Sequence, residues 1–199
     1  MNEDRRVRKT KLALKQALLT LLKKKTLGAV TITELVQRAD LNRSTFYHHY
    51  NNAAELFEEI RSGVLDDLAR CYREPYLHVR RLFLDELSAS SIQIFEHVYE
   101  NGGFYTVILD SSTAYDFQLE IQSMIQKITL EELLIDAPPS LNKELYASYH
   151  AHAITGMIMD WVRRGFPETP EYMNNQLLAI IRHHPEHPEV SYTASLHRQ

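Results

Sequence analysis

The spacing of apolar residues along the chain predicts a series of amphipathic helices. Between residues 5 and 24, leucines recur every three or four positions while lysines occupy the rest of the helical wheel. Segments with the same period are expected at residues 31–39, 43–50, 53–72, 79–100, 103–109, 114–135, 141–164 and 170–182. Six glycines and seven prolines are too few for the many turns of a β-sandwich or barrel. The pattern therefore predicts an all-α fold of about nine helices.

Two of the predicted helices are barely two turns long, and a tight turn joins them. The first is capped by Thr31 or Thr33, and Glu34 lies three residues after Thr31, as a capping box requires. Residues 40–42 form the turn, and Asn42 is a good N-cap for the second helix. These features predict a helix-turn-helix unit over residues 31–50, whose second helix would enter the major groove of DNA.

The helical wheel of the second short helix separates an inward face from a polar one. Phe46 and Tyr50 fall within one narrow arc and should pack inward, which leaves Ser44 and His48 at the centre of the opposite face. Hydroxyl groups on this face can hold phosphate oxygens, whereas His48 and the preceding Arg43 can reach base edges. The outward face is therefore expected to bind DNA.

Basic residues are concentrated in the first quarter of the chain. The net charge is −4 at pH 7, but residues 1–50 hold 11 lysines and arginines against four acidic residues. Residues 51–199 hold the remaining 11 basic residues and 22 acidic ones. This asymmetry predicts an anionic partner at the N-terminal end alone.

Nothing in the sequence predicts export, membrane insertion or a disulfide framework. No apolar stretch follows the first basic residues, and no window approaches the roughly 18 apolar residues of a membrane helix. The single cysteine, Cys71, fits a reducing compartment and is expected to be buried. We therefore expect a soluble cytoplasmic protein that does not contact membranes.

Residues 31–60, TITELVQRADLNRSTFYHHYNNAAELFEEI, resemble the N-terminal domain of the TetR (tetracycline-repressor-like) family. The resemblance covers residues 5–67, and its signature is a threonine, a short helix, a turn, the pattern Thr-x-Tyr-x-x-Phe/Tyr and an acidic, leucine-containing helix start. It implies that Thr45 and Tyr47 hold phosphates, while Arg43, Ser44 and His48 are the candidates for reading bases. The full set of DNA-binding candidates comprises Lys9, Lys11, Thr31, Asn42, Arg43, Ser44, Thr45, Tyr47 and His48.

Two positions depart from the family pattern. The family often has glycine in the turn where Asp40 stands, but aspartate tolerates a left-handed backbone better than most residues, so the fold should persist. At the position of Ala53 the family usually has a lysine that meets a phosphate. That contact should be missing here, which would weaken DNA binding.

The resemblance also implies that residues 68–183 form a helical regulatory and dimerisation domain, followed by a flexible tail at residues 184–199. The last two long helices would pair with those of a second copy as a four-helix bundle. Small and bulky residues are mixed over residues 144–165, which fits this pairing, although an ordinary core helix of a monomer has the same pattern. The candidates for the dimer interface are Ala151, Ile154, Ile158, Trp161, Leu177, Leu178 and Ile181.

Aromatic and polar residues on the middle helices are the candidates for an effector pocket. They are Tyr99, Phe104, Tyr105, Phe117, Tyr146, Tyr149 and His150, although aromatics at helical spacing also fit a plain core. Residues 149–171 loosely resemble the TetR subgroup that includes activators of dihydroxyacetone-kinase operons, in which the regulatory domain can bind a partner protein. The effector is thus expected to be either a small molecule or a protein.

Neither catalysis nor metal binding has a convincing motif in this chain. No phosphate loop, nucleophile elbow or Ser/His/Asp order stands out, and the clustered histidines lack ligand spacing. We therefore expect a homodimeric regulator without enzyme activity, cofactor or metal, which represses by holding a pseudo-palindromic operator and is released by its effector. The alternative is a helical adaptor whose C-terminal domain binds a partner protein and whose N-terminal unit binds DNA weakly or not at all.

Overall fold

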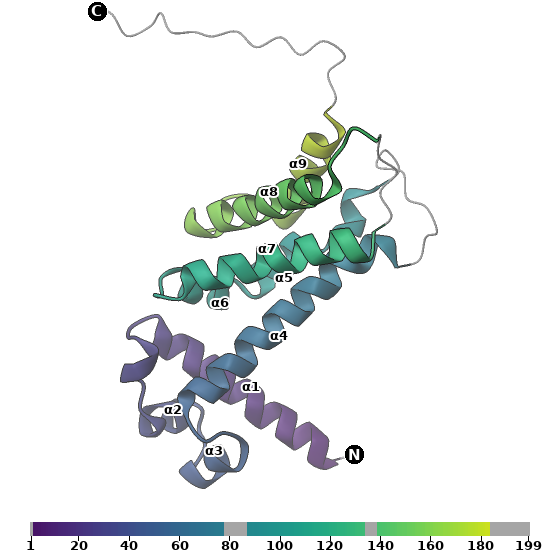
Figure 1. Cartoon of the computed structure of the whole chain (residues 1–199). Coiled ribbons are helices and arrows are strands. Elements are labelled where there is room, and N and C mark those ends of the chain that lie inside the picture. Colours follow the sequence, from purple (N-terminus) through teal and green to yellow (C-terminus); the bar gives the residue numbers. More distant parts are fainter. Residues whose placement is uncertain (1, 78–86, 134–138, 184–199) are drawn as a thin grey trace, which may run out of the picture.

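A computed structural model describes residues 2–77, 87–133 and 139–183 of the chain (Figure 1). Within these ranges the regular structure consists of nine α-helices and three short 3-10 helices, without a strand, which confirms the expected all-α fold. The α-helices are α1 (Asn2–Leu22), α2 (Ile32–Arg38), α3 (Arg43–His49), α4 (Ala53–Arg73), α5 (Ile94–Glu100), α6 (Gly102–Leu109), α7 (Ala114–Glu131), α8 (Lys143–Arg163) and α9 (Pro170–Arg182). The predicted tail at residues 184–199 lies outside the described residues.

Helices α1, α2 and α3 share an apolar core that fixes how α3 is presented. Leu14 and Leu18 of α1, Leu35 of α2 and Phe46 of α3 are all 0% exposed and belong to one buried cluster. Complete burial of a large apolar side chain contributes roughly 1.5–3 kcal/mol. A few such side chains are therefore enough to hold a helix as short as α3 in place.

Helix α4 connects the helix-turn-helix unit to the rest of the molecule. It packs against α1 near its start and against α5 and α7 further along (Figure 1). Arg61 of α4 pairs with Glu120 of α7, and Arg73 pairs with Glu132 just beyond the end of α7 at 2.6 Å. The domain boundary predicted between residues 67 and 68 lies inside this continuous helix. α4 therefore contacts both α1, beside the helix-turn-helix unit, and α7.

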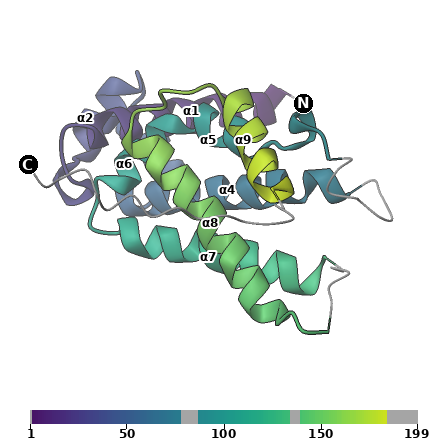
Figure 2. The same ribbon diagram turned by 90° about the horizontal axis from the view of Figure 1, so that it is seen from above.

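Helices α5 to α9 surround a second part of the core. α8 packs along α7, while α9 packs against α5 (Figure 2). Phe95, Tyr105 and Trp161 are each 0% exposed, and Cys71 of α4 is buried as expected. None of the helices among the described residues is long and apolar enough to cross a bilayer.

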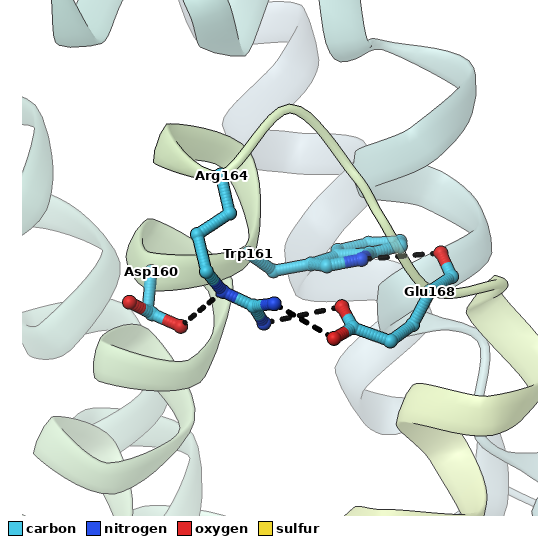
Figure 3. A network of polar contacts seen from close by, with 4 residues as sticks. All are labelled: Asp160, Trp161, Arg164 and Glu168. Atoms are coloured by element: carbon cyan, nitrogen blue, oxygen red, sulfur yellow. Dashed lines mark hydrogen bonds and ion pairs between the residues drawn. The ribbon is translucent and has the colours of Figure 1, made fainter.

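One arginine holds the connection between α8 and α9. Arg164 forms ion pairs with Asp160 at 2.8 Å and with Glu168 at 2.7 Å (Figure 3). The indole N–H of Trp161 donates a hydrogen bond of 3.2 Å to the backbone carbonyl of Glu168. The loop after α8 is therefore fastened to the last turn of that helix.

Phe166, in the same loop, packs against the start of α6. Its backbone is left-handed (φ 58°), as is that of the preceding Gly165 (φ 75°). A Cβ added to Gly102 would lie 3.1 Å from the Phe166 ring, so glycine permits this close approach. The α8–α9 connection is thereby packed onto the first turn of α6.

Two predicted boundaries need correction. The pattern predicts a helix over residues 79–100, but among the described residues the α-helix begins only at Ile94, and residues 87–93 contain the 3-10 helix Ala89–Ser91. Residues 78–86 lie outside the described part. The helix predicted from residue 103 begins one residue earlier, at Gly102, because the break falls at the non-helical Asn101.

Candidate DNA-binding interface

Thr31 caps α2 through the expected capping box. Its hydroxyl accepts a hydrogen bond of 3.3 Å from the Glu34 N–H, while the Glu34 carboxylate accepts from the Thr31 N–H at 3.1 Å and from the Thr31 hydroxyl at 2.8 Å. A hydrogen bond from Lys25, followed by those from Thr31, lowers the pKa of Glu34 to about 2. Both donors of Thr31 are therefore bound to an ionised carboxylate. The predicted phosphate contact of Thr31 would have to displace that carboxylate.

Asp40 forms the turn between α2 and α3. Its φ of 54° lies in the left-handed region, where the TetR pattern often has glycine. The next N–H, that of Leu41, donates a hydrogen bond of 2.9 Å to the carbonyl of Val36 and closes the end of α2. The expectation that aspartate supports this turn is confirmed.

Asn42 caps α3 with its side-chain oxygen, as expected. Oδ1 accepts hydrogen bonds from the Thr45 N–H at 2.8 Å, the Thr45 hydroxyl at 2.8 Å and the Ser44 hydroxyl at 2.7 Å. All three of these hydrogen bonds to Oδ1 come from the first turn of α3. A DNA contact by Asn42, which stays a prediction, would come from its amide nitrogen.

The face of α3 that points away from the core is polar. Phe46 is 0% exposed and Tyr50 is 3% exposed, so the predicted inward face is confirmed. Tyr47 is 58% exposed, and its ring meets the Phe46 ring edge to face at 5.5 Å. Ser44 and His48 are exposed, and Thr45 is half-buried. The hydroxyls and the imidazole therefore form one accessible surface.

Arg43 begins α3 and is already hydrogen-bonded to α2. Its guanidinium donates to the hydroxyl of Thr33, and this bond is exposed to solvent. Because an exposed hydrogen bond contributes little net free energy, the guanidinium can exchange Thr33 for a base edge. Sequence reasoning did not identify this contact.

The two lysines predicted to meet phosphates from α1 have different surroundings. Lys11 donates a hydrogen bond of 2.8 Å to Glu59 of α4 and lies 5.3 Å from the centre of the Tyr50 ring. Lys9 is exposed and has no ion pair with the described residues. Lys11 therefore has a partner within the chain, and the phosphate contacts of Lys9 and Lys11 both stay predictions.

Ala53 occupies the first position of α4 and is 8% exposed. Asn52 caps this helix, accepting a hydrogen bond of 2.9 Å from the Glu55 N–H. The position at which the family pattern places a lysine therefore carries a small buried side chain. The geometry of the helix start is retained without that cation.

The predicted dimer residues belong to the core of a single chain, so this prediction is wrong. Ala151, Ile154, Ile158, Trp161, Leu177 and Leu178 are at most 5% exposed, and Ile181 is partly buried against the same cluster. The apolar stripe of each helix packs inside the protomer, where it offers no surface to a second copy. The exposed faces of α8 and α9 carry other residues, among them Leu145, Tyr149, His152, Ala153, Gly156, Tyr172 and Ile180.

The predicted effector residues fall into three groups that the structure does not bring together. Phe104, Tyr105 and Phe117 form a buried aromatic cluster with ring centroids 5.3–5.9 Å apart. On α8, His150 contacts Tyr146 at 4.3 Å and Tyr149 at 5.6 Å. Tyr99 stacks on Trp161 at 6.2 Å. Their role as effector ligands stays a prediction.

These features define a helix-turn-helix DNA-binding protein with a helical C-terminal domain. Residues 16–60 match the family model of bacterial regulatory proteins of the tetR family, and residues 85–183 match that of a transcriptional regulator C-terminal region. The chain belongs to the TetR family of transcriptional regulators. As a member of this family it is a DNA-binding transcriptional regulator, as expected.

Individual relatives are distant. An uncharacterized HTH-type transcriptional regulator of Bacillus subtilis (strain 168), YxbF, is 20% identical over 167 residues, which cover 84% of this chain but only 43% of that protein. The solved dihydroxyacetone kinase operon activator DhaS is 19% identical, with a TM-score of 0.60 over 86% of this chain and 93% of that one. A TetR regulator from Streptococcus agalactiae 2603V is 21% identical, with a TM-score of 0.53 over 91% of this chain and 98% of that one. At such identities the structural likeness shows the fold alone.

Proposed function

We propose that the protein is a cytoplasmic, homodimeric repressor that holds a pseudo-palindromic operator and leaves it when an effector binds the C-terminal domain. The observation that carries this proposal is the construction of α3. Phe46 and Tyr50 anchor the helix in the core, so its opposite face presents hydroxyls and an imidazole to solvent. A short anchored helix with such a face suits the major groove.

Each side chain on α3 has a proposed role. Tyr47 and Thr45 hold phosphate oxygens, the Thr45 hydroxyl by exchanging Asn42 Oδ1 for a phosphate. Tyr47 is well placed because its ring packs against Phe46 while its side chain stays exposed. Arg43, Ser44 and His48 read base edges, with arginine suited to guanine. The Thr33 hydroxyl holds the Arg43 guanidinium until DNA replaces it.

The dimer forms through the exposed faces of α8 and α9. On α8, Leu145 and Tyr149 are 70% and 65% exposed, and Gly156 lies on the same stripe of the helix two to three turns further on. Tyr172 and Ile180 of α9 are 50% and 55% exposed. Large apolar side chains beside a small residue suit close helix–helix packing, and pairing two copies would set the half-sites one helical turn apart.

Effector control passes through α4. The ion pairs Arg61–Glu120 and Arg73–Glu132 each join residues 59 apart in sequence, so α4 and α7 run in the same direction and are joined at two points. The buried Tyr72 hydroxyl also forms a hydrogen bond of 2.9 Å with the hydroxyl of Thr129 on α7. A small molecule or partner protein that moves α7 would therefore move α4 and change the separation of the two α3 helices.

Fluorescence-anisotropy titration tests this proposal. The full chain is titrated against the DNA flanking its own gene and against a scrambled duplex, at two salt concentrations, with the mass of the complex measured by light scattering. Tight binding that prefers the flanking DNA and weakens steeply with salt, by a dimer, is the expected result. Weak and equal binding to both duplexes by a monomer would contradict the proposal.

A further inference from the structure

Phe166, in the connection between α8 and α9, has an unusual backbone for a bulky residue. Its φ of 58° lies in the left-handed region, which large side chains rarely adopt. The left-handed Gly165 before it already ends α8, since the N–H groups of Gly165 and Phe166 donate hydrogen bonds of 2.9 and 3.0 Å to the carbonyls of Val162 and Trp161. A second left-handed residue with a large side chain persists only where its surroundings hold it.

The ring of Phe166 is held between helices that are distant in sequence. It meets the Trp161 ring of α8 edge to face at 5.0 Å and the Tyr99 ring of α5 edge to face at 5.8 Å. Its Cζ atom would lie 3.1 Å from a Cβ added to Gly102, the first residue of α6. The left-handed backbone therefore places the ring at the corner where α5 ends and α6 begins.

The backbone that carries Phe166 is fastened on both sides. Arg164 pairs with Glu168 at 2.7 Å across the segment, and the Trp161 indole donates a hydrogen bond of 3.2 Å to the Glu168 carbonyl (Figure 3). Residues 164–168 thus form a short closed segment with Phe166 at its centre. The ring is held against α6 by this segment.

Helix α6 joins this corner to the two helices that carry the helix-turn-helix unit. It packs against α1, which in turn packs against α2. Its Phe104 is 1% exposed and meets the Phe57 ring of α4 at 6.1 Å. Because α4 begins shortly after α3 ends, a displacement of α6 would act on the helix-turn-helix unit from two sides.

We propose that Phe166 is a positioning residue for DNA binding, which sets the place of α6 against α1 and α4 and thereby the placement of α3. Two α3 helices must match half-sites of fixed separation. A less exact placement therefore lowers the preference for the operator, whereas the general attraction to phosphates is retained. This inference rests on the proposed repressor function and adds a connection through α6 to the one through α4.

Gly102→Ala and Gly103→Ala are a matched pair of variants in one turn of α6. A Cβ at position 102 would meet the Phe166 ring, whereas nothing lies within 4 Å of a Cβ at position 103. Phe166→Ala removes the ring itself. Urea midpoints and helical circular dichroism identify the variants that fold.

The test measures the preference of each variant for one duplex. The wild-type chain first selects its preferred duplex from a random library, and anisotropy then gives the affinity of every variant for this duplex and for a scrambled one. Phe166→Ala should lower the ratio of the two affinities by about two- to thirtyfold, with little change for the scrambled duplex. Gly102→Ala should lower the ratio as well, and Gly103→Ala should keep the wild-type ratio.

A folded Phe166→Ala variant that is less stable but keeps the wild-type ratio overturns the inference, because the ring then serves packing alone, while the proposed DNA-binding function stands. If Phe166→Ala does not fold, the two glycine variants decide, and equal ratios in them overturn the inference. A wild-type chain that selects no duplex from the library overturns the proposed function together with the inference.

Discussion

Lys11 of α1 donates a hydrogen bond of 2.8 Å to the carboxylate of Glu59 on α4. Lys15 contacts the other carboxylate oxygen at 3.0 Å, and the Lys11 ammonium lies 5.3 Å from the centre of the Tyr50 ring. Burial raises the pKa of Glu59, but the hydrogen bonds from Lys11 and Lys15 outweigh it, and the net shift is downward. This cluster ties the first helix to the helix that leaves the DNA-binding unit.

The first prediction follows from this pairing and concerns Lys11→Gln. The substitution should lower the free energy of unfolding by about 0.5–1 kcal/mol, as for other partly exposed ion pairs. The salt dependence of DNA binding should not change, because the ammonium is already paired with Glu59. Urea denaturation and salt-dependent anisotropy measure the two quantities. A fall in the salt slope of about 0.9 per chain would instead assign Lys11 to a phosphate.

Tyr47→Phe tests the phosphate role without disturbing the fold. The variant keeps the ring that packs on Phe46 and removes only the hydroxyl. Because a hydrogen bond to a charged group contributes about 1.5–3 kcal/mol, affinity should fall roughly tenfold or more for every duplex tested. Anisotropy against specific and scrambled DNA checks this. A loss confined to the specific duplex would make Tyr47 a base-reading residue.

Arg43→Ala and His48→Ala should reduce sequence discrimination and not general affinity for DNA. Each is expected to lower discrimination between the preferred and scrambled duplexes by about 1–3 kcal/mol while leaving scrambled binding largely intact. Competition titrations with the two duplexes measure the ratio. If both variants lose the same affinity for every sequence, the assignment of roles along α3 is wrong.

Local features of the DNA-binding unit could be predicted from the sequence. The caps at Thr31 and Asn42, the left-handed Asp40 and the inward Phe46 depend on residues within a few positions of one another. The role of Lys11 could not be predicted, because its partner Glu59 lies 48 residues away. The helical period indicates which residues share a face of a helix. It does not indicate which charged residue, far away in sequence, forms an ion pair with them.

There is a physical reason why the helical pattern indicated the wrong residues for the dimer interface. Hydrophobic periodicity marks the stripe that a helix buries first, and on α8 that stripe, with Ile154 and Ile158, packs inside the protomer. The outer face of α8, which we propose as the dimer interface, mixes apolar and polar residues and so has a weaker periodic pattern. Only the exposure of Leu145 and Tyr149 distinguishes that outer face.

Gly156→Arg tests the outer face of α8 as the dimer interface. In one chain nothing lies within 4 Å of a Cβ at this position, so the arginine fits the protomer. Between two closely packed helices it would separate the backbones and place a charge in the contact, so light scattering should show a monomer. Gly156→Ala is the matched control, which should stay dimeric and stabilise the helix by up to about 1 kcal/mol. A dimeric Gly156→Arg variant would place the interface elsewhere.

His97 of α5 is a buried imidazole in the regulatory part. The side chain is 5% exposed, and its ring meets the ring of Tyr105 edge to face at 6.2 Å. Burial lowers the pKa of His97; among the neighbouring groups of α4, Asp67 raises it and Arg70 lowers it, and the net shift is downward. At neutral pH the folded protein therefore favours the neutral form of this imidazole.

Acidification should consequently destabilise the protein through His97. In the unfolded chain a histidine has a pKa of about 6.5, so below that pH the unfolded state takes up a proton that the folded state does not. The free energy of unfolding should fall by up to about 1.4 kcal/mol per pH unit until the folded pKa is reached. Urea midpoints at pH 7.5 and pH 5.5, at one protein concentration, should differ less in His97→Phe than in the wild type. Tyr105→Phe changes the same site without removing a group that titrates in this range, so it should keep the wild-type difference; an equal pH dependence in His97→Phe would exclude His97 as its source.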